Sequence, residues 1–269
     1  MVDPYLPVKT TYADEVNSVA DASGQLSVSE IFGPTWQGEG SSIGKRCYFL
    51  RLGGCNQHCV WCDTPYTWDW TGRNGTVYDP KRELRKFSVD DLLAELALLM
   101  PDWELEVSQR AYLSKMLVIS GGEPMLQQKR LVPLARELRR TGWRIEIETA
   151  GTIFPLPELA PFIDQFNVSP KLENSGNDLK TRYKGKVLEA LQETGRVCWK
   201  FVVMDRADLS EIRHIVTEHR LSPVYIMPEG KTEDAIHGHM KDIAAAVLEE
   251  GWNLTSRLQV ELWGNRRGV

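Results

Sequence analysis

Short apolar runs recur along the chain and predict the strands of a sheet. The clearest is the continuous apolar run at residues 116–120, which is typical of a strand that is covered on both faces. Further β-like runs lie at 48–52, 144–148, 165–169, 197–204, 223–227 and 258–262. Apolar residues with the spacing of an amphipathic helix lie between these runs, at 89–96, 131–138, 212–216 and 240–247.

The alternation of strands and helices predicts an α/β fold with a parallel sheet. The expected architecture is a partial (β/α) barrel of about six parallel strands with an N-terminal extension, because a complete barrel needs eight. Residues 1–25 are polar and lack the apolar centre of a signal peptide, so we expect an N-terminal arm there. Residues 26–269 are expected to form a single domain, from whose core the polar stretch 69–86 departs.

Composition and charge restrict the classes of function. Hydrophobic residues make up 42% of the 269 residues and charged residues 26%, as in a globular protein with a sizeable core. The net charge of −5 disfavours nucleic-acid binding, which is driven by neutralisation of phosphates. No run of about 18 uncharged apolar residues occurs, so no membrane span is predicted. We therefore expect a cytoplasmic protein that binds neither nucleic acid nor a membrane.

Three of the five cysteines are concentrated in one loop. Cys55, Cys59 and Cys62 follow the spacing C-x3-C-x2-C, which can direct three thiolates to one inorganic centre. Three ligands leave one coordination position open for a substrate or cofactor. Cys47 and Cys198 lie in apolar or strand-like runs and are expected to be buried small side chains. A disulfide framework is not expected without a secretion signal.

Several kinds of site compete for this loop. A structural zinc site needs a fourth ligand, and His58 is a poor one because adjacent side chains in an extended loop point apart. A C-x2-C redox motif would not use Cys55. Chance clustering of buried cysteines is disfavoured because three of the five fall within eight residues. Soft thiolates favour an iron–sulfur cluster, and three cysteines leave one iron of a [4Fe–4S] cluster free to bind the amino and carboxylate groups of an amino acid.

The cysteine loop resembles that of radical S-adenosylmethionine enzymes, which carry C-x3-C followed by C-x-aromatic-C. Trp61 occupies the aromatic position, and the resemblance implies that it packs beside the adenine of the cofactor. It also implies a partial or full (β/α) barrel, in agreement with the alternation of apolar runs.

Four further segments are similar to one family within this superfamily, the 7-carboxy-7-deazaguanine synthases. The first reads Glu-Ile-Phe-Gly-Pro-Thr-Trp-Gln-Gly-Glu-Gly at residues 30–40 and is followed by Arg51. The resemblance implies that Trp36, Gln37, Glu39 and Arg51 contact a pterin substrate. Glu39 can accept two hydrogen bonds from an amino-pyrimidine edge, and Arg51 offers a fork to a carboxylate. The alternative is a Gly-rich turn that carries surface charges.

The second and third segments follow the cysteine loop and the apolar strand at 116–120. In the second, Asp63-Thr64, the resemblance implies that the Thr64 hydroxyl binds Mg²⁺, although Asp-Thr-Pro is also a common turn sequence. The third is Ser-Gly-Gly-Glu-Pro at 120–124. It implies that Gly121, Gly122 and Glu123 bind the methionine amino group of the cofactor, and that Ser120 lies near the substrate.

The fourth segment is a set of strand ends at 148–151, 169–171 and 200–202. The resemblance implies that Glu148, Ser169 and Lys171 bind the cofactor, with Glu148 at the ribose and Ser169 at the methionine carboxylate. Ala150 replaces a commoner Asn. Lys200 is expected to be an edge or snorkelling lysine and receives no role.

The resemblance weakens after residue 203. Met227-Pro228 replaces a family Gln-Pro, and the family's Gln-x-His-Lys reads Gln-Val-Glu-Leu at 259–262. These departures leave room for an altered substrate. The pair His237-x-His239 is expected at the surface, because residues two apart on a helix do not share a face.

The resemblance implies an enzyme that converts 6-carboxy-5,6,7,8-tetrahydropterin to 7-carboxy-7-deazaguanine by hydrogen abstraction, ring contraction and ammonia loss, in 7-deazapurine (queuosine-type) biosynthesis. It implies a [4Fe–4S] cluster, S-adenosylmethionine and Mg²⁺, with no catalytic residue beyond the cluster and the cofactor radical. It also implies a flavodoxin-like electron donor and a homodimer. Two alternatives remain open at this point, an activase that makes a glycyl radical on a partner protein and a non-enzymatic metal-binding module.

Overall fold

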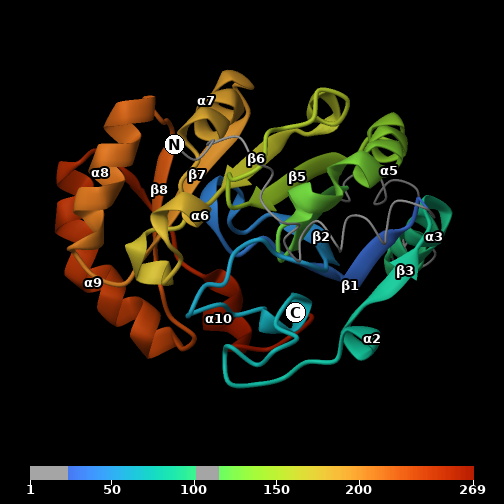
Figure 1. Ribbon diagram of the computed structural model, residues 1–269, viewed down its shortest axis with the longest axis horizontal. Helices are drawn as coiled ribbons and strands as arrows, with labels where there is room; N and C mark the ends of the chain where they lie inside the picture. The colour runs from blue at the N-terminus through green and yellow to red at the C-terminus, as the bar shows by residue number, and fades with distance from the viewer. Residues whose placement is uncertain (1–23, 101–114) are drawn as a thin grey trace, which may run out of the picture.

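The computed structural model describes residues 24–100 and 115–269, whose strands form one curved sheet (Figure 1). The order of strands across the sheet is β3-β1-β2-β4-β5-β6-β7-β8-β9. The strands are β1 (Leu26–Trp36), β2 (Arg46–Leu52), β3 (Arg85–Phe87), β4 (Met116–Gly121), β5 (Arg144–Thr149), β6 (Gln165–Val168), β7 (Val197–Val203), β8 (Val224–Pro228) and β9 (Asn253–Leu254). The expected arm at residues 1–25 lies almost entirely outside the described residues, so the domain boundary stays a prediction.

Most of the sheet is parallel. From β2 to β9 every neighbouring pair runs parallel, whereas β1 pairs antiparallel with both β2 and β3. The parallel part consists of six strands of ordinary length and the two-residue β9. The predicted α/β class and partial barrel are therefore confirmed, with β1 and β3 added at one edge.

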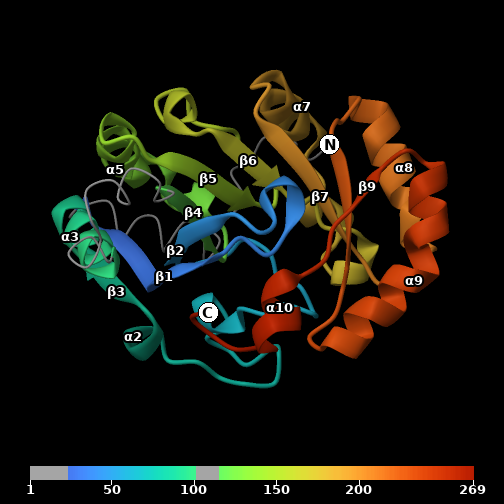
Figure 2. The same ribbon diagram turned by 180° about the vertical axis from the view of Figure 1, so that it is seen from behind.

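Helices surround the outer side of the arc of strands, while α10 lies at its open side (Figures 1 and 2). The helices are α2 (Pro80–Glu83), α3 (Val89–Leu99), α5 (Gln128–Arg140), α6 (Leu179–Arg182), α7 (Gly185–Glu193), α8 (Asp208–His219), α9 (Glu233–Glu249) and α10 (Leu258–Trp263). A capping box between Ser88 and Asp91 starts α3. Among the described helices, none has the length and apolar character needed to cross a membrane.

Several stretches differ from the sequence-based expectations, and elements that the sequence did not predict include β3 and α7. The run at 258–262 was expected as a strand but forms α10, because an apolar run this short fits either structure and only Val260 within it is buried. Residues 26–36, which had no assigned strand, form β1. Its register is irregular near Glu30 and between Phe32 and Thr35, which explains the weak alternation of its side chains.

Burial on both faces defines the centre of the sheet. Every residue of β7 is buried, including Lys200 at 4% exposure. Cys47 and Cys198 are buried, as expected of small apolar side chains. Parallel strands bring their carboxyl ends to one edge, so the ends of β2, β4, β5 and β6 and the loops that follow them meet there.

Candidate functional site

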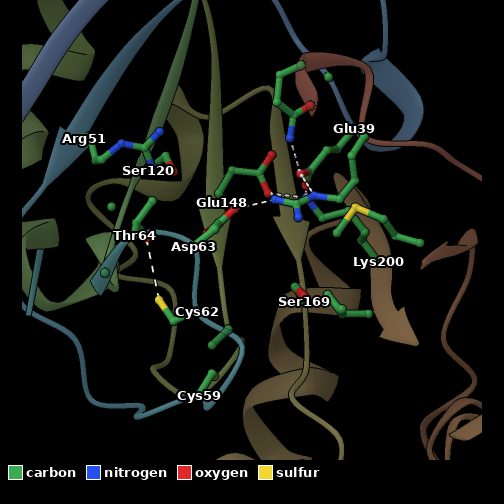
Figure 3. Close-up of a pocket in the computed structure, with 18 of the residues that line it drawn as sticks. Glu39, Arg51, Cys59, Cys62, Asp63, Thr64, Ser120, Glu148, Ser169 and Lys200 are labelled. Carbon is green, nitrogen blue, oxygen red and sulfur yellow. Dashed lines mark hydrogen bonds and ion pairs between the residues drawn. The ribbon is translucent and has the colours of Figure 1, made fainter. Parts of the chain in front are cut away.

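A pocket lies at the carboxyl ends of the parallel strands, and Figure 3 shows the side chains that converge on it. It brings together residues that are far apart in the sequence. All the predicted site residues except Glu123 line this pocket, namely Trp36, Gln37, Glu39, Arg51, Cys55, Cys59, Trp61, Cys62, Thr64, Ser120, Gly121, Gly122, Glu148, Ser169 and Lys171. The third and fourth segments thus meet the cysteine loop in space.

The cysteine loop packs closely against the end of β4. A Cβ atom on Gly122 would lie 2.1 Å from the carbonyl oxygen of Gly54 and 2.8 Å from the Cβ of Cys55. The amide of Glu123 donates a hydrogen bond to the same Gly54 carbonyl at 2.8 Å. Only glycine at position 122 allows this approach, so the Gly-Gly pair serves the placement of the loop.

Each sulfur of the cysteine loop accepts an N–H hydrogen bond from a neighbouring residue. The donors are the backbone N–H of Gln57 to Cys55 at 3.4 Å, Asn177 Nδ2 to Cys59 at 3.3 Å and Trp68 Nε1 to Cys62 at 3.4 Å. Such donors stabilise negative charge on sulfur and tune the potential of an iron–sulfur cluster.

The donor set suits an iron–sulfur cluster. All three cysteines line one pocket, and soft thiolates are the ligands that such clusters prefer. Burial raises the pKa of all three thiols, which makes the thiolate form costly. The positive charge of iron would offset this cost, because a metal ion favours deprotonation of the thiols that bind it. The ring of His58 packs edge-on against Trp68 at 5.0 Å between centroids, in agreement with its exclusion as a ligand.

Lys200 lies at the centre of a charged group inside the pocket. Its Nζ is 2.5 Å from Glu39 Oε2 and 2.9 Å from Glu148 Oε2 (Figure 3). Gln37 Nε2 donates to the other oxygen of Glu148 at 3.0 Å. Sequence reasoning gave Lys200 no role, although a lysine inside the apolar run of β7 was a visible signal. A buried lysine needs a buried partner, and here it has two.

The charges of this group shift its pKa values in opposite directions. Burial by itself raises the pKa of Glu39, but the charges of Lys200 and Arg257 outweigh it and lower the pKa to about 2. Burial, reinforced by repulsion from Glu39, raises the pKa of Glu148 despite the proximity of Lys200. Glu39 is therefore the firmly ionised member, and Glu148 is the one that takes up a proton more readily.

Arg257 and Gln259 enter the pocket from the segment around α10. The Arg257 guanidinium pairs with Asp63, lies 3.3 Å from Glu39 Oε1 and donates to the Gly230 carbonyl at 2.6 Å. Gln259 Nε2 donates to Glu39 Oε1 at 2.7 Å. Sequence reasoning missed Arg257, because nothing in an isolated arginine indicates contacts with residues this distant along the chain.

Arg51 lies in a row of polar side chains across three strands. The sheet register pairs Glu30 of β1 with Arg51 of β2, and Arg51 with Ser120 of β4. Arg51 Nε is 2.9 Å from Glu30 Oε2, and its Nη1 donates to Ser120 Oγ at 3.4 Å. The neighbouring Thr64 hydroxyl lies 3.8 Å from the sulfur of Cys62.

Glu123 differs in position from the other predicted cofactor residues. Its fully buried carboxylate accepts hydrogen bonds from the Thr149 hydroxyl and the Ala150 amide, both at 2.8 Å, and from the Met125 amide at 3.0 Å. These bonds tie the end of β5 to the end of β4. Glu123 does not line the pocket, and its expected contact with the cofactor stays a prediction. By contrast, Lys171 Nζ lies 2.9 Å from Ser169 Oγ at the pocket wall.

Known proteins are similar in sequence to this chain over the residues that form the pocket. A family model described as a 4Fe-4S single cluster domain matches residues 37–192. The chain is 31% identical to the 7-carboxy-7-deazaguanine synthase of Pyrobaculum aerophilum, over 92% of this chain and 99% of that protein. It is 30% identical to the 7-carboxy-7-deazaguanine synthase of Bacillus subtilis, over 91% of this chain and 98% of that protein.

A solved structure is similar over nearly the whole chain. The crystal structure of QueE from Escherichia coli superposes with a TM-score of 0.61 at 25% identity, and the match covers 90% of this chain and 98% of that one. The similarity therefore extends beyond the cysteine loop to the sheet and to the strand ends that surround the pocket.

Proposed function

Because this chain belongs to the 7-carboxy-7-deazaguanine synthase family, we propose that it converts 6-carboxy-5,6,7,8-tetrahydropterin to 7-carboxy-7-deazaguanine by hydrogen abstraction, ring contraction and ammonia loss. The observation that carries the proposal is one pocket lined by the three cysteines and, beside them, by Glu39 and Arg51. A glycyl-radical activase or a simple metal-binding module has no use for that second set of side chains. In 7-deazapurine biosynthesis the product is a precursor of queuosine-type nucleosides.

The chain's own residues would hold the cofactors. Cys55, Cys59 and Cys62 would bind three irons of a [4Fe–4S] cluster, a cofactor that agrees with the matched 4Fe-4S family model. With S-adenosylmethionine bound, this centre supplies one-electron reductive cleavage and hydrogen-atom abstraction. We assign contacts with S-adenosylmethionine to Trp61, Gly121, Gly122, Glu148, Ser169 and Lys171. Glu123 would support them indirectly through the end of β5.

The opposite part of the pocket suits a flat, carboxylated heterocycle. Arg51 can present its guanidinium to the substrate carboxylate, and Ser120 beside it offers a hydroxyl. Glu39 is held ionised by Lys200, so it can accept N–H bonds from an amino-pyrimidine edge. Trp36 and Gln37 complete this wall. The side chains thus orient the substrate and exclude water, while none of them performs the hydrogen transfer.

The magnesium site, the electron donor and the homodimer are parts of the proposal that rest on the resemblance, whereas the domain boundary rests on composition. Thr64 would bind Mg²⁺ through its hydroxyl, since a hard oxygen suits this ion and the neighbouring Asp63 is already paired with Arg257. A flavodoxin-like protein would deliver the electron, and the enzyme would act as a homodimer. Residues 26–269 would form one domain behind an arm at 1–25.

Anaerobic turnover tests the proposal. The protein is reconstituted with iron and sulfide, reduced, and given S-adenosylmethionine with and without 6-carboxytetrahydropterin. We expect 5′-deoxyadenosine and 7-carboxy-7-deazaguanine only in the complete mixture. Absence of cofactor cleavage would favour a metal-binding module, and cleavage without a deazapurine would indicate another substrate. As a matched pair, Cys62→Ala should lose cluster iron, whereas Cys198→Ala should keep it because Cys198 does not line the pocket.

A further inference from the structure

The segment that follows α10, residues 264–269, runs beside the short helix at Pro65–Thr67 (Figures 1 and 2). Its residue Val269 lines the pocket. Arg267 fixes the segment there, because its guanidinium pairs with Glu30 and lies 2.7 Å from Glu83 Oε2. The same guanidinium carbon lies 3.9 Å from the ring centroid of Tyr66. These three contacts come from β1, from α2 and from the short helix after the cysteine loop.

Glu30 connects Arg267 to the pocket. One carboxylate oxygen, Oε1, pairs with Arg267, and the other, Oε2, lies 2.9 Å from Arg51 Nε. The Tyr66 hydroxyl also donates to Oε2, at 3.3 Å. Glu30 is 11% exposed and Arg51 15%, so water screens this contact only weakly. A single negative charge is thus shared between two guanidinium groups.

Because Glu30 is shared with Arg267, it engages only part of the Arg51 guanidinium. A carboxylate with a single arginine neighbour frequently pairs with it through both oxygens and offsets its charge. Here the second oxygen of Glu30 is taken by Arg267, so Arg51 uses only its Nε toward Glu30. Within residues 24–100 and 115–269, the outer N–H groups of Arg51 make one weak hydrogen bond, with Ser120 Oγ at 3.4 Å. They stay available to a further carboxylate.

We propose that Arg267 is a positioning residue for Arg51. By binding Glu30 it keeps the guanidinium fork of Arg51 free for the carboxylate of the substrate, and it anchors the 264–269 segment at the pocket. This inference rests on the proposed function, since that function supplies the carboxylated pterin. Arg267 acts through Glu30 and Arg51 and is not itself a catalytic residue.

Ligand binding tests this inference independently of turnover. The probe is 6-carboxypterin, an oxidised analogue, and the matched ligand is pterin without the carboxylate. Dissociation constants are measured by equilibrium dialysis with the reconstituted protein. For Arg267→Gln we expect about tenfold weaker binding of 6-carboxypterin, the equivalent of one partly lost charge-assisted hydrogen bond, and unchanged binding of pterin. Arg267→Lys should lie between Arg267→Gln and the wild type.

Two variants separate this role from alternatives. Arg266→Gln removes the same charge from the adjacent exposed position, and it should bind 6-carboxypterin as the wild type does. An equal loss in Arg266→Gln would mean general charge attraction and overturn the proposal. Adding Glu30→Gln to Arg267→Gln should restore binding of 6-carboxypterin, because Arg51 then has no competing carboxylate. If the double variant stays weak, Arg267 has only an anchoring role and the inference fails.

Failure of the Arg267 inference can be distinguished from failure of the proposed function. Iron content after reconstitution should be equal in wild type and Arg267→Gln, which checks that the cysteine loop is intact. If the wild type forms no deazapurine, the proposed function fails. The comparison of 6-carboxypterin with pterin still decides whether Arg267 controls carboxylate binding.

Discussion

Lys200 and Glu39 form a buried ion pair, with 2.5 Å between Nζ and Oε2, although the two residues are 161 positions apart in the sequence. Lys200 belongs to the centre of β7, whereas Glu39 follows β1. The same ammonium group also forms an ion pair with Glu148 at the end of β5. One lysine thus connects the proposed substrate side of the pocket with the proposed cofactor side.

Removal of this lysine should destabilise the fold strongly. In Lys200→Met the carboxylates of Glu39 and Glu148 lose their shared cation while staying buried. We expect the free energy of unfolding to fall by about 3–5 kcal/mol, the usual loss when one partner of a buried pair is removed. Urea unfolding at neutral pH measures it. Lys186→Met on α7 is the matched control, because Lys186 is exposed. Equal losses in both variants would contradict the central role of Lys200.

Acid should weaken the protein partly through Glu39. Its pKa is about 2 in the folded protein against an ordinary value of 4.5, so ionised Glu39 favours the folded state. This contribution is fully present above pH 4.5 and is lost as the pH falls from 4.5 towards 2. The stability difference between wild type and Glu39→Gln should therefore be constant from pH 7 to about 5 and shrink below that. A difference that does not change down to pH 3 would contradict the lowered pKa.

Substitution of Gly122 should displace the cysteine loop. The added Cβ of Gly122→Ala would lie 2.1 Å from the Gly54 carbonyl oxygen, so the loop or β4 must move. We expect reconstituted iron to fall to well under half of the wild-type content. Gly238→Ala is the control, because its Cβ would meet nothing within 4 Å inside α9. That variant should keep its iron and gain up to about 1 kcal/mol of stability from helix propensity. Full iron loading in Gly122→Ala would contradict the tight packing.

The indole N–H of Trp68 should raise the reduction potential of the cluster. It donates to the sulfur of Cys62 at 3.4 Å, and such a bond favours the more negative, reduced state. Trp68→Phe keeps an aromatic ring but removes the donor, so we expect the potential to become more negative by tens of millivolts. Redox titration followed by electron paramagnetic resonance measures this change. An unchanged potential, with iron content intact, would mean that this N–H does not act on the cluster.

The cysteine loop and the strand ends could be predicted because each is a local pattern. The spacing of Cys55, Cys59 and Cys62 is visible in eight residues, and apolar runs of fixed length mark the parallel strands. Parallel strands necessarily bring their carboxyl ends to one edge. The resemblance implied that the segments at 120–124 and 148–151 bind the same cofactor as the cysteines, and the pocket contains residues of both segments.

The remainder of the site depends on contacts that no local pattern contains. The run at 258–262 fits a strand or a helix, and only its packing beside the Gly38 carbonyl, which accepts from the Leu258 amide at 2.9 Å, selects α10. The contacts of Glu123 are of the same kind: its carboxylate binds Thr149 and Ala150 at the end of β5, while its expected contact with the cofactor stays a prediction.

By itself, the sequence determined an α/β protein with a three-cysteine loop at the end of its sheet, because hydrophobic periodicity and ligand spacing act over a few residues. The tertiary structure decided which charges meet at that loop. Arg257 reaches Glu39 across 218 residues of sequence, and Arg267 reaches Glu30 across 237. Burial forces such charges to pair, but only the complete fold selects the partner.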